Sequence, residues 1–156
     1  MLAPGDCVPG TARVWAATGT GPISLGEALA GESLVLLCFY PFDWSTTCTN
    51  ELFLLRDRLA DLEAVGVRPV GISRDSPWSH AAWTGTLGVE GVPLLSDWNG
   101  EVALGFGVAR EVNGMADVPA RCAFLIEGDT VRASWPLGSE LPDIDAVIAA
   151  ALSLSR

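Results

Sequence analysis

The fold of this chain is decided by one stretch, Phe39-Tyr40-Pro41-Phe42-Asp43-Trp44-Ser45-Thr46-Thr47-Cys48-Thr49-Asn50-Glu51. It begins in an apolar run, Leu34 to Tyr40, that is typical of a strand and that Pro41 ends. Hydroxyl side chains then lead to Cys48 at the start of an amphipathic segment. Unpaired N–H groups and a partial positive charge at a helix N-terminus favour the thiolate form of a cysteine. The stretch therefore predicts a nucleophilic cysteine where a strand gives way to a helix.

The same stretch contains the pattern Pro-x-x-x-Ser-x-x-Cys, formed by Pro41, Ser45 and Cys48. This pattern, with Phe39-Tyr40 before it and Glu51 after it, resembles the active-site signature of the peroxiredoxins, thiol peroxidases with a modified thioredoxin fold. Three further segments resemble the family in the same order: Asp75-Ser76-Pro77-Trp78-Ser79-His80-Ala81-Ala82-Trp83; Pro93-Leu94-Leu95-Ser96-Asp97, continuing through Gly100 to Gly105-Phe106-Gly107-Val108; and Arg121-Cys122-Ala123-Phe124-Leu125-Ile126. The similarity covers nearly the whole chain, and on this basis the chain is identified as a member of that family.

The spacing of apolar residues predicts an α/β chain in which strands and helices alternate. We expect these elements in order: a short strand over 12–17, a brief helix over 24–30, a buried strand over 33–40, a helix over 47–65, a strand over 67–73, a helix over 77–87, a hairpin over 122–127 and 131–135, and a helix over 141–154. Together with the resemblance, this order implies a thioredoxin-like fold with an N-terminal extension and a central mixed β-sheet flanked by helices.

Length and charge limit the classes of function. The chain of 156 residues fits one domain, so we expect residues 1–156 to form a single thioredoxin-like domain. The formal net charge of −10 repels phosphate backbones and argues against nucleic acid as a partner. No apolar stretch reaches the roughly 18 residues of a membrane span, and the segment from Met1 lacks the features of a signal peptide. We therefore expect a cytoplasmic protein without a membrane partner.

The cysteines and the histidine give no support for a metal site. The four cysteines show no Cys-x-x-Cys spacing, and His80 is the single histidine of the chain. We therefore expect no metal and no cofactor. His80 is also the only candidate for a base beside Cys48, and we interpret it as an ordinary polar group of its helix.

The resemblance implies a mechanism in which the Cys48 thiolate attacks a peroxide oxygen and becomes a sulfenic acid. Ser45, Arg121 and backbone N–H groups around Thr47 and Cys48 would stabilise the charge on the leaving oxygen. Pro41 would shield the thiolate from water and hold the loop.

These site residues also have alternative roles. Ser45 could act only as the N-cap of the helix, and Pro41 could simply end the strand. Arg121 could be a surface residue at a strand edge. Glu51 suits the first helical turn, where it either positions Arg121 or remains a solvated carboxylate.

Peroxiredoxins differ in the thiol that resolves the sulfenic acid. No cysteine follows Cys122, so the family's usual intersubunit partner is absent, and the position used by another subgroup is Phe53. We expect Cys38 to be a buried apolar side chain and Cys122 to point away from the site, because strand residues alternate. Cys7 remains an alternative. We predict a one-cysteine enzyme regenerated by an external thiol, either a thioredoxin-like protein or a low-molecular-weight thiol.

Two other functions are compatible with the sequence. The segment from Ser45 to Cys48 is one cysteine short of a Cys-x-x-Cys motif, so a monothiol thioredoxin-like exchanger is one of them. The other is a repurposed or non-catalytic peroxiredoxin-fold protein, such as a redox sensor or a partner protein.

Aromatic residues near the predicted site indicate a homodimer. Phe42, Trp44, Trp78 and Trp83 lie in the motif segments, and exposed aromatic surface tends to mark an interface. Two-fold pairing is the commonest closed assembly. The alternative is that these rings fill the core.

Overall fold

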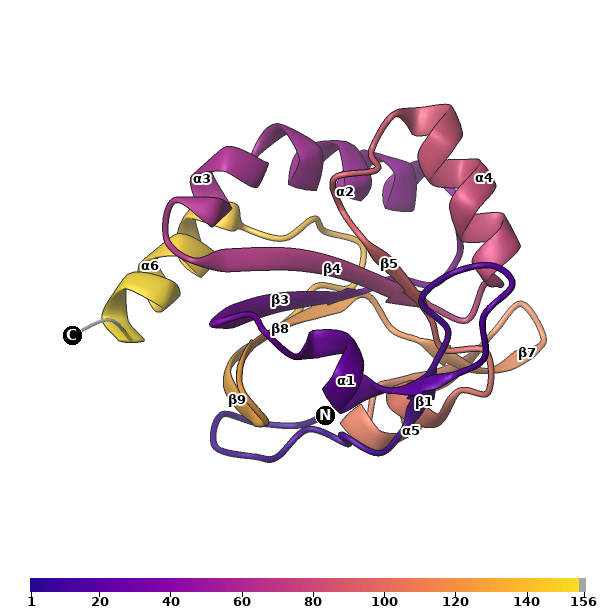
Figure 1. Ribbon diagram of the computed structural model, residues 1–156, viewed down its shortest axis with the longest axis horizontal. Helices are drawn as coiled ribbons and strands as arrows, with labels where there is room; N and C mark the ends of the chain where they lie inside the picture. The colour runs from indigo at the N-terminus through magenta and orange to yellow at the C-terminus, as the bar shows by residue number, and fades with distance from the viewer. Residues whose placement is uncertain (155–156) are drawn as a thin grey trace.

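The centre of the protein is a mixed five-stranded sheet, seen in a computed structural model that describes residues 1–154 (Figure 1). The strand order is β5-β4-β3-β8-β9. The strands are β3 (Leu34–Phe39), β4 (Val67–Ser73), β5 (Leu94–Ser96), β8 (Cys122–Glu127) and β9 (Thr130–Pro136). β3 is parallel to β4 and antiparallel to β8, β4 is parallel to β5, and β8 is antiparallel to β9. The predicted central mixed sheet is confirmed.

β3 lies in the middle of the sheet because it is apolar along its whole length. All six of its residues are buried, as is typical of a strand that is covered on both faces. Successive side chains point to opposite faces, so Leu36 and Cys38 belong to one hydrophobic cluster and Leu37 and Phe39 to the other. The two clusters form the two halves of the core.

Helices cover both faces of the sheet (Figure 1). The helices over the face of Cys38 are α2 (Thr46–Asp57), α3 (Leu59–Glu63), α4 (Pro77–Leu87) and α6 (Ile144–Leu154). The helices over the opposite face are the short α1 (Leu25–Leu29) and α5 (Glu101–Phe106). No helix within residues 1–154 combines the length and the apolar character needed to cross a bilayer.

Three predicted boundaries are wrong. The strand predicted over 12–17 is reduced to the two residues of β1 (Arg13–Val14). The helix predicted over 47–65 is interrupted at Arg58, where φ is −103° and ψ is 9°. The Arg58 side chain binds Asp61 in α3 and Asp145 in α6, which ties the interruption to a neighbouring helix. The helix predicted over 141–154 begins later, because the Asp143 carboxylate accepts from the N–H of Ala146 at 3.1 Å and caps the first turn.

Several short elements are not in the sequence-based prediction. These are β2 (Ile23–Ser24), which pairs with β1 (Arg13–Val14), the strand β5, the helix α5, and the hairpin of β6 (Ala109–Val112) and β7 (Met115–Pro119). Most are too short for a periodic pattern to be visible. The hairpin did carry a signal, because Asn113-Gly114 at its turn has positive φ at both residues, and Asn-Gly is a preferred hairpin turn.

Candidate active site

The sheet brings two distant segments to one place. β3 leads through the loop 40–45 into α2, which carries Cys48 in its first turn. β8 runs antiparallel to β3, and Phe39 at the end of β3 pairs with Cys122 at the start of β8. Arg121, immediately before β8, therefore lies beside the start of α2. This strand pairing brings together Cys48 and Arg121, which are 73 positions apart in the chain.

Cys48 and Arg121 are in direct contact and are both buried. The Arg121 Nη2 atom donates to Sγ of Cys48 at 3.0 Å. Arg121 is 5% exposed, so the alternative of a surface arginine at a strand edge is wrong. A buried cation at this distance favours a negative charge on the sulfur atom.

Glu51 completes this contact from the next turn of α2. Its Oε1 atom accepts from Nη1 of Arg121, and its side chain is fully buried. Burial raises the pKa of Glu51 to about 7, although the charge of Arg121 opposes the shift. Burial works against the charge of Arg121 too, but its contacts with Cys48 and Glu51 outweigh this and raise its pKa. The alternative of a solvated carboxylate at position 51 is therefore wrong.

The other predicted site residues lie around the start of α2. Ser45 is the N-cap of this helix, and its Oγ accepts from the N–H of Cys48 at 3.3 Å. Thr47 is half-buried in the first turn, and Pro41 is half-buried in the loop before it. Trp44 has a φ of 71°, a left-handed conformation that bulky residues rarely adopt. The loop therefore reaches Ser45 through an unusual backbone bend.

The remaining cysteines differ from Cys48 in their surroundings. Cys38 and Cys122 are buried, as predicted for Cys38. Burial raises the pKa of Cys38 well above its ordinary value and raises that of Cys122 to about 12, with the charge of Glu51 adding to both shifts. Cys122 belongs to the hydrophobic cluster on the face opposite Cys48, as strand alternation predicts. Both thiols are therefore protonated at neutral pH.

Cys7 lies far from the site. It is exposed and forms an isolated bridge with Thr130, at the turn between β8 and β9. Arg121 adjoins the other end of β8, which has 6 residues. At about 3.3 Å per residue, the two ends of this strand lie roughly 17 Å apart. A disulfide needs Cα atoms within about 7 Å of each other. A bond between Cys7 and Cys48 of one chain would therefore need a large rearrangement.

The aromatic residues divide between surface and core. Trp44 and Trp78 are 54% and 67% exposed, and Phe42 is half-buried. Trp83 is fully buried and packs against Tyr40, so its assignment to an exposed aromatic surface is wrong. It lies on the inner side of α4, where a helix facing a sheet must place its apolar residues.

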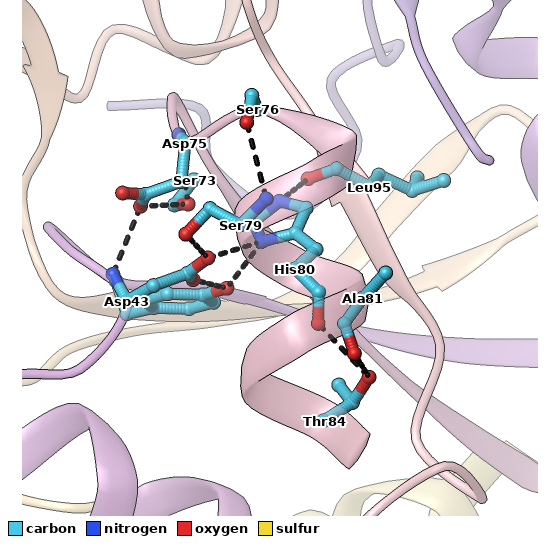
Figure 2. A network of polar contacts seen from close by, with 10 residues as sticks. Asp43, Ser73, Asp75, Ser76, Ser79, His80, Ala81, Thr84 and Leu95 are labelled. Atoms are coloured by element: carbon cyan, nitrogen blue, oxygen red, sulfur yellow. Dashed lines mark hydrogen bonds and ion pairs between the residues drawn. The ribbon is translucent and has the colours of Figure 1, made fainter. Parts of the chain in front are cut away.

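The structure also reveals polar residues that the sequence-based prediction missed. Asp43, Ser73, Asp75 and Ser79 form a buried or partly buried network around His80 (Figure 2). Nδ1 of His80 contacts Asp43 and Nε2 contacts the carbonyl of Leu95, so both ring nitrogens are engaged by groups other than Cys48. A polar residue in the middle of the motif, Asp43, was the available signal. Residues 1–154 contain no group of three or more His, Cys, Asp or Glu side chains arranged to hold a metal ion.

Comparisons with known proteins agree with the resemblance seen in the sequence. A model of the AhpC/TSA family matches residues 4–134. The probable peroxiredoxin prdx-3 of Caenorhabditis elegans is 33% identical over 138 residues, which are 84% of this chain and 59% of that protein. The putative peroxiredoxin YkuU of Bacillus subtilis is 33% identical over 102 residues, 62% of this chain and 57% of that protein. The chain thus spans less than two thirds of the length of these relatives.

Solved structures share the fold along the whole chain. Peroxidoxin BcpB from Mycobacterium tuberculosis has a TM-score of 0.80 at 29% identity, with 99% of both chains covered. The bacterioferritin comigratory protein of Xanthomonas campestris, described for its alkyl peroxide reduction activity, has a TM-score of 0.77 at 25% identity, with 100% of this chain and 99% of that chain covered. Reduced Prx3 of Vibrio vulnificus in complex with hydrogen peroxide has a TM-score of 0.87 at 20% identity, with the same coverage. The predicted thioredoxin-like fold is confirmed.

Proposed function

This chain belongs to the AhpC/TSA family, the peroxiredoxins, and we propose that it is a thiol-dependent peroxidase acting on hydrogen peroxide and organic hydroperoxides. One observation carries the proposal: Arg121 donates to Sγ of Cys48 at 3.0 Å inside the protein. A buried cation at this distance stabilises the thiolate, which is the nucleophilic form. The organic class of substrate is supported by the alkyl peroxide reduction described for the Xanthomonas relative.

In the proposed reaction, the Cys48 thiolate attacks the terminal oxygen of the peroxide. An S–O bond forms while the O–O bond breaks, and the electron pair of that bond leaves on the second oxygen. This oxygen takes up a proton and departs as water or an alcohol. Cys48 is oxidised to a sulfenic acid, and the peroxide is reduced by two electrons.

The surrounding groups have distinct roles in this proposal. Arg121 and the N–H groups at the start of α2, near Thr47, stabilise the charge that develops on the leaving oxygen. Glu51 accepts from Arg121 and holds the guanidinium in place. Ser45 fixes the first turn by accepting from the Cys48 N–H, and its hydroxyl proton can be donated to a peroxide oxygen. Pro41 limits the access of water.

An external thiol regenerates the enzyme in this proposal. Two features support it: burial raises the pKa values of Cys38 and Cys122, and Cys7 lies at the far end of β8. The reductant attacks the sulfur of the Cys48 sulfenic acid, water leaves, and a second thiol reduces the mixed disulfide. The reductant is a thioredoxin-like protein or a low-molecular-weight thiol.

We also propose that the protein forms a homodimer through the surface around the active-site loop. The exposed rings of Trp44 and Trp78 support this interface. Residues 1–156 are proposed to work as a single thioredoxin-like domain, supported by one sheet that carries both hydrophobic clusters. The unpaired cysteines fit a reducing compartment such as the cytoplasm.

Stopped-flow mixing tests the proposed peroxidase function. Reduced protein is mixed with hydrogen peroxide or an organic hydroperoxide, and tryptophan fluorescence is followed, since Trp44 lies beside the active-site helix. We expect a peroxide-dependent change that is lost in Cys48→Ser and retained in the matched control Cys38→Ser. Peroxide turnover that persists in Cys48→Ser would contradict the mechanism.

A further inference from the structure

A buried polar network anchors the loop that leads to Cys48 (Figure 2). Asp43, in this loop, is 6% exposed, and its Oδ2 atom contacts Nδ1 of His80 at 2.7 Å. Oδ2 also accepts from the hydroxyl of Ser79 at 2.8 Å, and Oδ1 accepts from the hydroxyl of Tyr40 at 2.7 Å. Both oxygens of the carboxylate are therefore occupied by donors, from Tyr40 directly after β3 and from α4.

Both ring nitrogens of His80 face acceptors. Nδ1 faces the Asp43 carboxylate, and Nε2 lies 3.1 Å from the carbonyl oxygen of Leu95. The Tyr40 hydroxyl lies 3.5 Å from Nδ1, but it donates its proton to Oδ1 of Asp43 at 2.7 Å. A carbonyl oxygen and an ionised carboxylate have no proton to donate, and a neutral imidazole carries a proton on only one nitrogen. A neutral ring would leave one nitrogen lone pair pointing at an oxygen in a site where His80 is 4% exposed. With Asp43 ionised, both contacts are hydrogen bonds only when both nitrogens carry protons.

We propose that His80 is the imidazolium partner of Asp43, and that this buried ion pair positions the Cys48 helix for reaction with peroxide. The proposal rests on the peroxidase function above and adds two positioning residues to it. Neither Asp43 nor His80 touches the sulfur atom. They act through the loop backbone that connects Asp43 to Ser45.

The chain between the pair and the nucleophile is short and bent. Asp43 is tied to α4 by its side chain and to Asp75 by its backbone N–H, which donates to Oδ2 at 2.9 Å. Trp44 then takes the left-handed backbone conformation, and Ser45 caps the helix at the N–H of Cys48. A bulky residue keeps such a conformation only when its surroundings hold it. Fixed contacts at Asp43 on one side and at Ser45 on the other hold it here.

Other ionisable groups face the pair from each neighbouring element. Tyr40 directly follows β3, and burial raises the pKa of its hydroxyl well above the usual value, so it stays a donor to Asp43. Asp75 follows β4 and accepts from the hydroxyl of Ser73 at 2.6 Å. Glu90, after α4, and His80 both line a cavity of about 280 Å³. Asp43 contacts the His80 ring directly, whereas Asp75 contacts the Asp43 backbone, and burial raises the pKa of the Asp75 carboxyl.

Nuclear magnetic resonance of untagged protein labelled with ¹⁵N-histidine tests the charge state directly. His80 is the single histidine of the chain, so one imidazole is observed. At neutral pH we expect both ring nitrogens to show the protonated signature, and in Asp43→Asn we expect one of them to lose it. A ring with one unprotonated nitrogen in the wild-type protein would overturn the proposal.

Kinetics test the positioning role. Asp43→Asn keeps the size of the side chain and removes the charge, and we expect the reaction of Cys48 with hydrogen peroxide to slow by about tenfold. The double variant Asp43→Asn/His80→Gln should be no slower than the slower single variant, because the two residues act as one unit. The control Asp129→Asn, at an exposed turn, should react at the wild-type rate. Purely additive effects, or a wild-type rate in folded Asp43→Asn, would overturn the proposal.

A second readout separates this inference from the proposed function. The rate at which iodoacetamide alkylates Cys48 depends on the surroundings of its thiolate and not on a reaction with peroxide. We expect this rate to fall several-fold in Asp43→Asn and His80→Gln and to be unchanged in Asp129→Asn. If the wild-type protein consumes no peroxide, the proposed function is wrong. If the alkylation rate of Cys48 is unchanged in Asp43→Asn, the positioning role is wrong.

Discussion

The guanidinium of Arg121 lies 3.0 Å from the sulfur of Cys48, although 73 residues separate them in the chain. The pairing of β3 with β8 produces this contact, because it places the start of β8 beside the end of β3. The same guanidinium binds the buried carboxylate of Glu51. Nucleophile, cation and carboxylate thus form one connected group, in which a change at any member should be felt by the other two.

Replacing Arg121 should slow the peroxide reaction. We expect Arg121→Ala to reduce the rate constant with hydrogen peroxide by about a hundredfold or more, as when a donor that stabilises a developing charge is lost. Arg121→Lys should recover part of this rate, because lysine keeps the positive charge but lacks the planar guanidinium that donates to two partners at once. Stopped-flow fluorescence measures the rates, and circular dichroism checks the fold. Arg132→Ala, at an exposed position of β9, is the control. An unchanged rate in Arg121→Ala would make Arg121 purely structural.

Glu51 should make the stability of the protein depend on pH. The folded protein holds the Glu51 proton up to a pKa of about 7, whereas the ordinary value is 4.5. Between these values the folded state binds more protons than the unfolded state, so the contribution of Glu51 to stability is lost as the pH rises. In Glu51→Gln this dependence disappears.

Urea unfolding at several pH values within and beside this window measures the effect. We expect the free energy of unfolding of the wild-type protein, relative to Glu51→Gln, to fall from the acidic to the neutral side. Glu140→Gln, at an exposed position, should show no such trend relative to wild type. A difference between wild type and Glu51→Gln that stays constant with pH would contradict the raised pKa.

Resolution of the oxidised enzyme should require an outside thiol. After one equivalent of peroxide, intact mass spectrometry with a reagent that traps sulfenic acids should find one adduct, located on Cys48. The same result is expected for Cys7→Ser, because Cys7 lies at the opposite end of β8. A stoichiometric disulfide between Cys48 and Cys7 would instead make this a two-cysteine enzyme.

The exposed tryptophans should lie in a dimer interface. Sedimentation at micromolar concentration should give twice the chain mass of 16.4 kDa. Trp78→Asp should shift the equilibrium toward the monomer, because it places a charge on a ring surface that is 67% exposed in the single chain. Leu152→Asp, on α6, is a matched control at a residue that is 47% exposed. A monomer in the wild-type protein refutes the interface.

The elements that carry the chemistry were predictable because their signals are local. The apolar run of β3, the proline and hydroxyls after it, and the spacing of leucines in α2 all lie within a few residues of one another. The short strand β5 and the interruption at Arg58 were not predictable in this way. The first has too few residues for a pattern, and the second involves contacts with α6.

The sequence by itself determined the alternation of strands and helices, the position of Cys48 at a helix start, and the family, because each depends on neighbouring residues. Only the tertiary structure decided which distant side chains meet. Burial of Glu51 beside Arg121, the inward orientation of Trp83, the separation of Cys7 and the enclosure of His80 by Asp43 and Leu95 all depend on strand order and register. The hydrogen bonds among these contacts join residues 15 to 70 positions apart, and a pattern read along the chain does not contain the distance between them.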